Sequence, residues 1–198
     1  MNYSYQVVAM KNEIISMIGE SSNAVALCKE LAPQIEKAAK LVSNALKNNK
    51  KILLAGNGGS ASQASHIAAE FIGKYKIERK GMPAISLASD LSAITAIGND
   101  YGFDRVFERQ IEALGNEEDV LIVLTTSGNS QNLINAVEKA KKMNIHVISL
   151  LGKGGGKMKN ISDVEIIVPS DNVPRIQECH LMILHIICEL VDKELFGK

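Results

Sequence analysis

The feature that most constrains this chain is the alternation of short, β-type apolar runs with stretches of helical periodicity. The five runs cover residues 51–56, 83–87, 119–124, 145–151 and 164–169. Each is bounded by Gly, Asn, Asp, Ser or Pro, as strands usually are. Several are almost continuously apolar, which is typical of parallel strands buried on both faces. The pattern predicts a three-layer α/β/α sandwich around a five-stranded parallel sheet, in a flavodoxin-like arrangement.

Helical spacing of apolar residues fills most of the intervals between these runs. The predicted helices cover residues 60–73, 90–98, 102–114 and 130–143, with a final amphipathic helix over 174–196. Two more amphipathic helices precede the first strand, over 5–28 and 33–48, and are separated near Pro33. At 198 residues the chain is long enough for one core without disulfides or metals. We therefore expect a single domain, residues 1–198, with a helical pair (1–49) added to an α/β core (50–198).

Charge and composition exclude several classes of partner. Lys plus Arg and Asp plus Glu both number 22, so no overall charge favours nucleic acid or an anionic membrane. The N-terminus lacks the pattern of a secretory signal, and the longest apolar run near the end is interrupted by His185 and Glu189. The three cysteines form no CxxC pair, which favours reduced thiols in a cytoplasmic protein. Any anion must then be bound by local groups.

The first polar turn, "GNGGSA" at residues 56–61, joins a strand to a helix. Glycines let the backbone approach a ligand closely, and the helix start offers free N–H groups to a phosphate. The turn also matches a permissive dinucleotide fingerprint, which requires an acidic residue about 20 positions further on. The first acid after the next strand, Asp90, lies 34 residues beyond Gly56, so the dinucleotide reading is disfavoured. A Walker loop is excluded because no Gly-Lys-Ser/Thr follows.

The second polar turn, "TTSGNS" at residues 125–130, lies between a strand and a helix. Its four hydroxyls and the free amides of the helix start favour a phosphate site without arginine. The alternative is a purely structural turn in which Ser130 caps the helix. A third glycine-rich stretch, "GKGGGKM" at residues 152–158, follows the fourth strand. The sequence leaves open whether it binds an anion or is a surface loop.

Candidate acid and base residues lie on two of the predicted helices. His66 and Glu70 are four residues apart and therefore share a helix face. The alternative for this pair is a surface ion pair, but the small apolar residues around it suggest an enclosed face. On the last helix, His180 and His185 lie about 140° apart, so only one of them can face a given site. A histidine within an apolar run is also a common core residue, and the sequence leaves that reading of His185 open.

Long motifs in this chain resemble those of the phosphoheptose isomerase family, whose members are sugar-isomerase (SIS) domain enzymes. The resemblance spans nearly the whole chain and includes "AGNGGSASQASHIAAEFIGKY", "GNDYGF", "TTSGNSQNLINAVEKAK", "GKGGGKM" and "RIQECHLMILHIICELVDKELF". It implies conversion of sedoheptulose 7-phosphate to a heptose 7-phosphate through an enediol. In that family the product serves bacterial surface polysaccharides such as lipopolysaccharide or capsule.

The resemblance also implies roles for individual residues. Glu70 and His185 match the catalytic carboxylate and histidine. Some members bind one zinc ion per subunit through residues that match His66, Glu70, Gln177 and His185, and no nucleotide cofactor is implied. The implied substrate-binding residues are Asn57, Gly58, Gly59, Ser60, Lys74, Asn99, Asp100, Thr125, Thr126, Ser127, Ser130 and Gln177. Lys74 departs from the arginine that relatives often carry, which loses the bidentate fork.

The resemblance further implies a homotetramer with sites built from more than one subunit, in which the N-terminal helices serve oligomerisation. The main alternative is a non-catalytic SIS protein that associates with the replication initiator DnaA. That relative lacks the residues matching Glu70 and His185, both of which are present here. A sugar-phosphate-sensing module is a further alternative, but no DNA-binding segment is recognisable in this sequence. The expected partner is therefore a small sugar phosphate rather than nucleic acid or a membrane.

Overall fold

The computed structural model describes residues 3–197, with side chains described from Met10 onward. Five parallel strands form one sheet in the order β2-β1-β3-β4-β5. The strands are β1 (Ile52–Gly56), β2 (Ala84–Ser86), β3 (Val120–Thr125), β4 (His146–Leu151) and β5 (Val164–Ile167). This is the strand order of flavodoxin-like sheets. The predicted fold class and all five predicted strands are confirmed.

The α-helices within the described residues also follow the prediction. They are α1 (Tyr3–Leu27), α2 (Ala32–Lys47), α3 (Gly59–Ile72), α4 (Leu91–Tyr101), α5 (Val106–Leu114), α6 (Gln131–Lys142) and α7 (Val173–Phe196). Three short 3-10 segments join or flank them: η1 (Cys28–Leu31), η2 (Phe103–Arg105) and η3 (Lys153–Met158). The predicted helix over 102–114 begins later than expected because Gly102, with a φ of 88°, breaks the chain and η2 intervenes.

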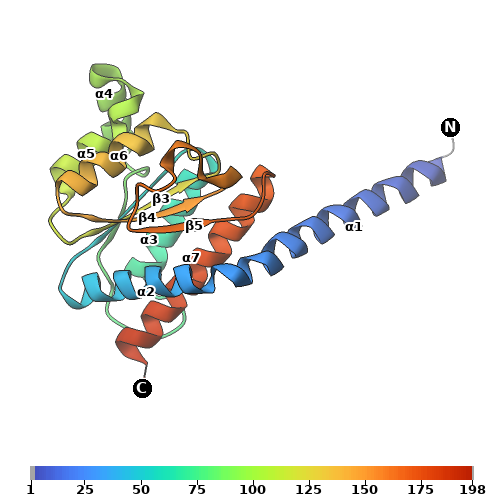
Figure 1. The fold of residues 1–198 in the computed structure, drawn as a ribbon, viewed down its shortest axis with the longest axis horizontal. Coiled ribbons are helices and arrows are strands. Elements are labelled where there is room, and N and C mark those ends of the chain that lie inside the picture. Colours follow the sequence, from blue (N-terminus) through green and yellow to red (C-terminus); the bar gives the residue numbers. More distant parts are fainter. Residues whose placement is uncertain (1–2, 198) are drawn as a thin grey trace.

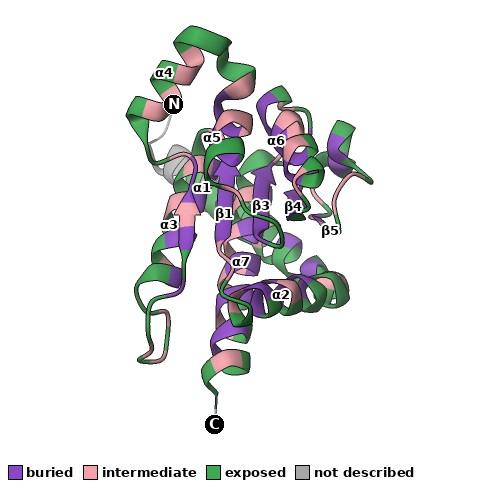
Figure 2. Ribbon diagram, turned by 90° about the vertical axis from the view of Figure 1, so that its left-hand side faces the viewer, coloured by how far each residue is buried: buried purple, intermediate pink, exposed green. Residues whose placement is uncertain are grey.

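Helices cover both faces of the sheet (Figure 1). Helices α2, α3 and α7 pack on one face, and α5 and α6 pack on the other. Successive residues of β3 contribute to opposite layers, with Ile122 in the first core and Val123 in the second. All residues of β1 and β3 are buried, as the purple central strands of Figure 2 show. This explains why the strands are apolar along their whole length rather than alternating.

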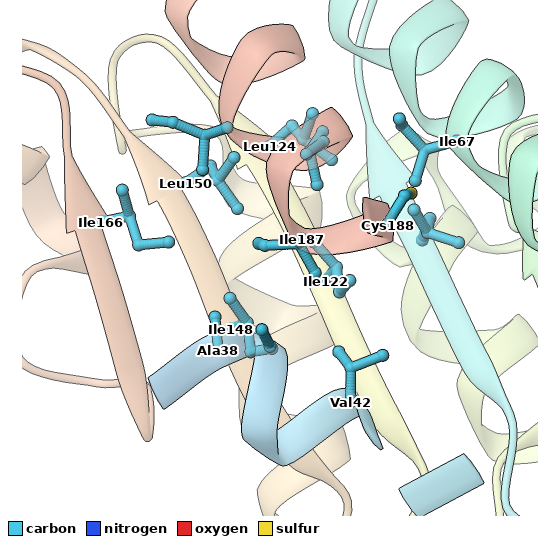
Figure 3. Packing of buried hydrophobic residues seen from close by; sticks show 14 of the residues in the cluster. Ala38, Val42, Ile67, Ile122, Leu124, Ile148, Leu150, Ile166, Ile187 and Cys188 are labelled. Carbon is cyan, nitrogen blue, oxygen red and sulfur yellow. The ribbon is translucent and has the colours of Figure 1, made fainter. Parts of the chain in front are cut away.

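The core under α7 is the larger of the two and positions that helix. Figure 3 shows side chains of β3 and β4, such as Ile122 and Leu150, together with Ile187 of α7 and Val42 of α2. Ile67 of α3 belongs to the same cluster, so α3 and α7 are held against a common surface. Burial of such aliphatic side chains contributes about 1.5–3 kcal/mol each. The relative placement of α3 and α7 is therefore set by the core beneath them.

Helices α3 and α7 lie side by side and run in the same direction. Gln63 of α3 donates its side-chain Nε2 to the backbone oxygen of Gln177 on α7, at 2.7 Å. Further along both helices, the Nε2 atoms of His66 and His185 are 2.9 Å apart. Both contacts advance toward the C-termini of the two helices, which shows that α3 and α7 run in the same direction where they meet.

Helix α1 differs from the other helices because it extends away from the α/β body (Figure 1). Its apolar residues have helical spacing, as predicted, but they are largely exposed. Ile14, Ile15 and Ile18 are 52%, 58% and 61% exposed. Among the helices of the described residues, none has the length and hydropathy that crossing a membrane requires.

Candidate active site

The two predicted polar turns meet at the point where the strand order reverses. Strands β1 and β3 are neighbours, and the first turn (residues 56–61) and the hydroxyl turn (residues 125–130) follow their carboxyl ends. Open parallel sheets bind ligands at this position. The side-chain amides of Asn57 and Asn132 join the two turns by reciprocal hydrogen bonds of 3.0 and 2.9 Å. These bonds tie the first turn to the start of α6, directly after the hydroxyl turn.

Asn132 was not among the predicted site residues. It lies in the first turn of α6 and is 2% exposed. Its only sequence signal is a polar residue at a position that the helical pattern assigns to the buried face. Both the nitrogen and the oxygen of the Asn57 side-chain amide bond to Asn132. A sugar that contacts this amide, as the sequence predicts, would have to bind alongside these two hydrogen bonds. Gly58, with a φ of 55°, and Gly59 shape the same turn, and Ser60 is buried in the first turn of α3.

The four hydroxyls of the hydroxyl turn fall into two groups, according to whether they accept a hydrogen bond within the turn. The Thr125 hydroxyl accepts a hydrogen bond from the Gly128 amide at 3.2 Å, and the Ser127 hydroxyl accepts one from the Asn129 amide at 3.2 Å. Ser130 occupies the N-cap of α6, but its side chain makes no capping hydrogen bond. The expected capping role of Ser130 is therefore wrong, while Thr125 and Ser127 do support the turn, and the phosphate role of the turn stays a prediction. Within the described residues, Thr126 and Ser130 have hydroxyls without internal partners.

The glycine loop (residues 152–158) packs directly against the hydroxyl turn. Gly128, with a φ of 64°, approaches the carbonyl of Gly155 so closely that a Cβ there would collide with it. The Met158 amide donates to the Gly128 oxygen at 3.0 Å, and the Lys157 amide donates to Asn129 Oδ1 at 3.1 Å. The sequence had left this loop open between anion site and surface loop. In the structure it supports the conformation of the hydroxyl turn.

A second group of polar side chains lies between α3 and α7. His66 Nε2 is 2.9 Å from His185 Nε2 and 3.5 Å from Glu70 Oε1. We call these three residues the α3–α7 cluster. The i, i+4 spacing of His66 and Glu70 places both on the face of α3 that meets α7. The apolar run of α7 therefore contains a partly exposed histidine that pairs with His66, and the reading of His185 as an isolated core residue is wrong.

The electrostatic setting of His185 favours a neutral imidazole. Partial burial lowers the pKa of His185, the nearby His66 lowers it further, and Glu70 acts in the opposite direction. The expected enclosure is incomplete within one chain, because the side chains of His66 and Glu70 are 45% and 24% exposed. Helices α3 and α7 flank the cluster, and the side chains of His66 and Glu70 stay partly open to solvent in a single chain.

Tyr75 is a further residue of this site that the sequence analysis did not identify. Its ring stacks on the His185 ring, with centroids 5.7 Å apart and planes inclined by 20°. Tyr75 follows α3 by three residues, in a segment without regular structure. Nothing in the local sequence indicates that this aromatic ring turns back toward α7. Its position depends on how the segment after α3 is held.

The other histidine of α7 is the core residue. His180 is fully buried, and its Nε2 is 3.1 Å from the backbone oxygen of Leu151. Burial lowers its pKa to about 4, and its Nδ1 has no hydrogen-bond partner. The predicted angular separation of His180 and His185 explains the division. One of them points to the sheet and the other to α3.

Gln177 lies near the start of α7, next to the first polar turn and the start of α3. A Cβ at Gly59 would be 2.6 Å from Gln177 Nε2, so the glycine leaves room for this side chain at the start of α3. The position suits a substrate contact beside the first turn. The predicted metal role of Gln177 requires its amide to turn toward His66, and it remains a prediction.

The remaining predicted substrate residues do not join these groups within one chain. Lys74 is exposed and pairs with Glu78 at 2.9 Å. Asn99 and Asp100 are exposed near the end of α4, where the Asn99 amide donates to the Asp100 carboxylate at 2.7 Å. Helix α4 packs on the face of the sheet opposite α3 and α7 (Figure 1). Their roles in substrate binding remain predictions.

The α3–α7 cluster has the composition of a metal site. His66, Glu70 and His185 each offer one ligand atom, and these atoms all lie within 4.8 Å of one another. Tetrahedral zinc places nitrogen ligands about 2.0–2.1 Å from the ion, so two such ligands lie roughly 3.3 Å apart. The two imidazole nitrogens would need to separate by only a few tenths of an ångström. The donor set therefore fits zinc.

Comparison with known proteins agrees with these observations. A model of the SIS domain family matches residues 15–152. A phosphoheptose isomerase of Helicobacter pylori is 53% identical over 170 residues, covering 86% of this chain and 88% of that protein. One from Aliarcobacter butzleri is 49% identical over 187 residues, covering 94% and 99%.

Two solved structures extend the comparison to the fold. A phosphoheptose isomerase from Neisseria gonorrhoeae superposes with a TM-score of 0.87 at 41% identity, covering 93% of this chain and 99% of that one. One from Francisella tularensis has a TM-score of 0.82 at 39% identity, covering 98% and 100%. The match in sequence and fold extends over nearly the whole chain, and this chain belongs to the phosphoheptose isomerase family of SIS-domain proteins.

Proposed function

We propose that this protein is an aldose–ketose isomerase that converts sedoheptulose 7-phosphate to D-glycero-D-manno-heptose 7-phosphate through an enediol. The observation that carries the proposal is the α3–α7 cluster, which brings a carboxylate and an imidazole together beside two phosphate-type turns. A carboxylate and a neutral imidazole are the acid/base groups that this reaction requires. The names of the relatives supply the substrate class.

The reaction transfers one proton between adjacent carbons and one between their oxygens. Glu70 removes a proton from C1 of the ketose, and the C1–C2 enediol forms as the carbonyl oxygen at C2 is protonated. Glu70 then returns the proton to C2, while the hydroxyl proton at O1 is removed and the C1 carbonyl forms. His185, kept neutral by its lowered pKa, accepts and donates the protons at the oxygens. No net oxidation occurs.

The phosphate is assigned to the hydroxyl turn. Thr126 and Ser130 offer hydroxyls without internal partners, and the start of α6 adds free backbone amides. Ser60, at the first turn, and His66 are six residues apart on α3, which is roughly 9 Å of helix rise. An extended sugar phosphate can span that distance. Binding energy at the distal phosphate would then orient the reacting carbons at Glu70.

A zinc ion would be held by His66, Glu70 and His185, with Gln177 as the fourth ligand implied by the family. Such an ion supplies Lewis-acid polarisation of the carbonyl and enediolate oxygens. Glu70 and His185 remain the groups that move protons in this proposal.

We propose a homotetramer in which the exposed apolar face of α1 packs against other copies of the chain. Met10, Ile14 and Ile18 are each more than half exposed. A second subunit would cover the open side of the α3–α7 cluster and could bring Lys74, Asn99 or Asp100 of one copy to the site of another. Light scattering after size-exclusion chromatography should give four chains for the wild type. Ile14→Glu with Ile18→Glu should give a smaller species, and an unchanged mass would reject this role for α1.

The direct test of the function is NMR of sedoheptulose 7-phosphate with the purified protein in D₂O, with and without a chelator. The expected result is an aldose product that carries deuterium at C2, because the proton held by Glu70 exchanges with solvent. No exchange at C1 or C2 under either condition would reject the isomerase. We also propose that the product serves a bacterial surface polysaccharide, as the resemblance to the family implies. A cytoplasmic location is proposed as well, supported by the three unpaired cysteines.

A further inference from the structure

The segment that leads from α3 back to β2, residues 73–83, lies along α7. We call it the return segment. Along this segment, Tyr75 pairs with His185, Lys76 with Glu189, and Arg79 with Asp192. Since the three α7 residues are separated by four and three positions, they lie on one face of the helix. The return segment therefore follows the same face of α7 that carries His185.

Arg79 is the buried anchor of this segment. The Arg79 and Asp192 side chains are only 1% and 3% exposed, and Nε of the arginine is 2.7 Å from Oδ1 of the aspartate. The Lys76–Glu189 pair is at the surface, with 57% and 31% exposure, and exposed pairs contribute little stability. The ion pair of Arg79 is thus the contact that holds the segment in place.

Arg79 also binds the end of α3. Its Nη2 donates to the backbone oxygen of Glu70 at 2.9 Å, and its Nη1 donates to the oxygens of Phe71 and Gly73 at 2.9 and 3.0 Å. The last carbonyls of a helix lack partners within the helix, and here one guanidinium supplies them. A single side chain therefore joins the backbone of Glu70 to α7, two turns beyond His185.

Stability alone does not account for this arrangement. Oδ2 of the buried Asp192 has no hydrogen-bond partner. A buried ion pair with an unsatisfied oxygen is often no more stable than a well-packed apolar pair of similar volume. What an apolar pair cannot do is bond the α3 carbonyls, which need directed N–H donors. The feature specific to this ion pair is the distance and orientation that it imposes between α3 and α7.

We propose that Arg79, held by Asp192, is a positioning residue for the reaction: it sets the Glu70 carboxylate and the Tyr75 ring against His185. This proposal rests on the proposed isomerase function. The other contacts that hold α3 against α7 are the core beneath them, the Gln63–Gln177 hydrogen bond and the α3–α7 cluster itself. The hydrogen bonds of Arg79 go to Asp192 and to backbone oxygens of α3 and the return segment, so Arg79 acts through the backbone rather than on the cluster side chains.

The test compares this ion pair with a second buried pair remote from the cluster. Asp119 is 1% exposed, pairs with Lys51 at 2.5 Å and precedes β3, at the end of the sheet opposite the polar turns. Asp192→Asn and Asp119→Asn remove the same charge in similar burial. Both should lower the melting temperature. Only Asp192→Asn and Arg79→Lys should lower kcat, by about tenfold or more, since small displacements of reacting groups are costly.

A rescue experiment separates positioning from simple stabilisation. Arg79→Met combined with Asp192→Leu replaces the ion pair by apolar side chains and should restore the melting temperature. It should leave kcat low and KM near the wild-type value, because the polar turns are unchanged. Recovery of both melting temperature and kcat would overturn the proposal, as would wild-type kcat in folded Asp192→Asn or Arg79→Lys.

A second readout does not depend on activity. The chain has four histidines, so their imidazole signals can be assigned by single substitutions. In Asp192→Asn the His185 signals should shift as Tyr75 leaves its stacked position, while those of His146, on the exposed end of β4, should not move. Asp119→Asn should leave both unchanged. Unchanged His185 signals in folded Asp192→Asn would overturn the positioning role. If the wild type has no isomerase activity but the expected signal shifts are seen in Asp192→Asn, the proposed function is rejected. The conclusion that Arg79 and Asp192 hold the return segment against α7 then still stands.

Discussion

The two ends of the proposed substrate site are built in different ways. The phosphate end comes from contiguous residues, because the hydroxyl turn lies within residues 125–130 and the hydroxyls of Thr125 and Ser127 accept hydrogen bonds from amides of the same turn. The chemical end is assembled across the fold. His66 and His185 are 119 positions apart, and Tyr75 reaches them from the return segment.

This difference separates the consequences of mutation at the two ends. A change in the hydroxyl turn removes a donor or distorts a short loop, and its effect should appear in binding. A change near the α3–α7 cluster alters the relation between two helices, and its effect should appear in the chemical step. The following predictions test that division, beginning with the largest expected effect.

Removal of the carboxylate should have the largest effect. Glu70→Gln keeps the size of the side chain but cannot carry a proton between carbons, so kcat should fall by about 10³-fold or more. Isothermal titration with sedoheptulose 7-phosphate should still detect binding, because the hydroxyl turn is intact. Glu112→Gln, on the exposed side of α5, is the matched control and should keep wild-type kcat. Substantial turnover by Glu70→Gln would remove Glu70 from the mechanism.

The buried His180 of α7 should make the stability of the fold depend on pH. His180 has a pKa lowered to about 4 in the folded protein, against 6.5 when unfolded. Above 6.5 neither state binds the proton, so the full stability is present. As pH falls from 6.5 toward 4, the unfolded state is protonated first, and about 3 kcal/mol of the free energy of unfolding is lost. Urea denaturation at several pH values measures this loss.

Substitution isolates the contribution of His180. In His180→Leu the decrease in unfolding free energy between pH 6.5 and 4 should be smaller by that amount. If His180→Leu and the wild type have the same pH dependence, another group is responsible for it.

Substitutions of the two neighbouring threonines of the hydroxyl turn should have different effects, one on substrate binding and the other on stability. Thr126→Val removes a hydroxyl without an internal partner and should raise KM by about tenfold or more, because hydrogen bonds to charged groups contribute about 1.5–3 kcal/mol. Its kcat should change little. Thr125→Val removes the buried acceptor of the Gly128 amide and should lower the melting temperature. Equal KM values for Thr126→Val and the wild type would place the phosphate elsewhere.

The contact between the hydroxyl turn and the glycine loop should give the smallest effect. Asn129→Ala removes a bond to the Lys157 amide and one to the Ser127 oxygen. Both groups lie near the surface, where a hydrogen bond contributes about 1 kcal/mol, so KM should rise about fivefold. Steady-state kinetics measures this change. An effect on kcat larger than that on KM would show that the loop also orients the reacting carbons.

Much of the fold could be predicted because its signals are local. The order of strands and helices follows from hydrophobic periodicity, and the position of the polar turns follows from glycines and hydroxyls after apolar runs. The candidate pair His66 and Glu70 was visible from its i, i+4 spacing. The enclosure expected for that pair was not found within one chain, because the sequence does not show what lies on the open side of α3.

The residues that the sequence missed share one property, which is that their role depends on a distant partner. Asn132 holds Asn57 across 75 positions, and Arg79 reaches Asp192 across 113. Neither has a distinctive neighbour in the sequence. Tyr75 likewise gains its role only when the return segment is held against α7.

The sequence by itself determined the element order, the parallel sheet with both faces buried, and the position of the two polar turns. These features follow from side-chain periodicity and backbone preference, which act over a few residues. Only the tertiary structure decided which histidine of α7 faces α3, that Ser130 leaves its hydroxyl without a capping bond, and that Arg79 joins the end of α3 to α7. Helix rotation and spacing result from the packing of many side chains onto a common sheet, and no local stretch of sequence contains that information.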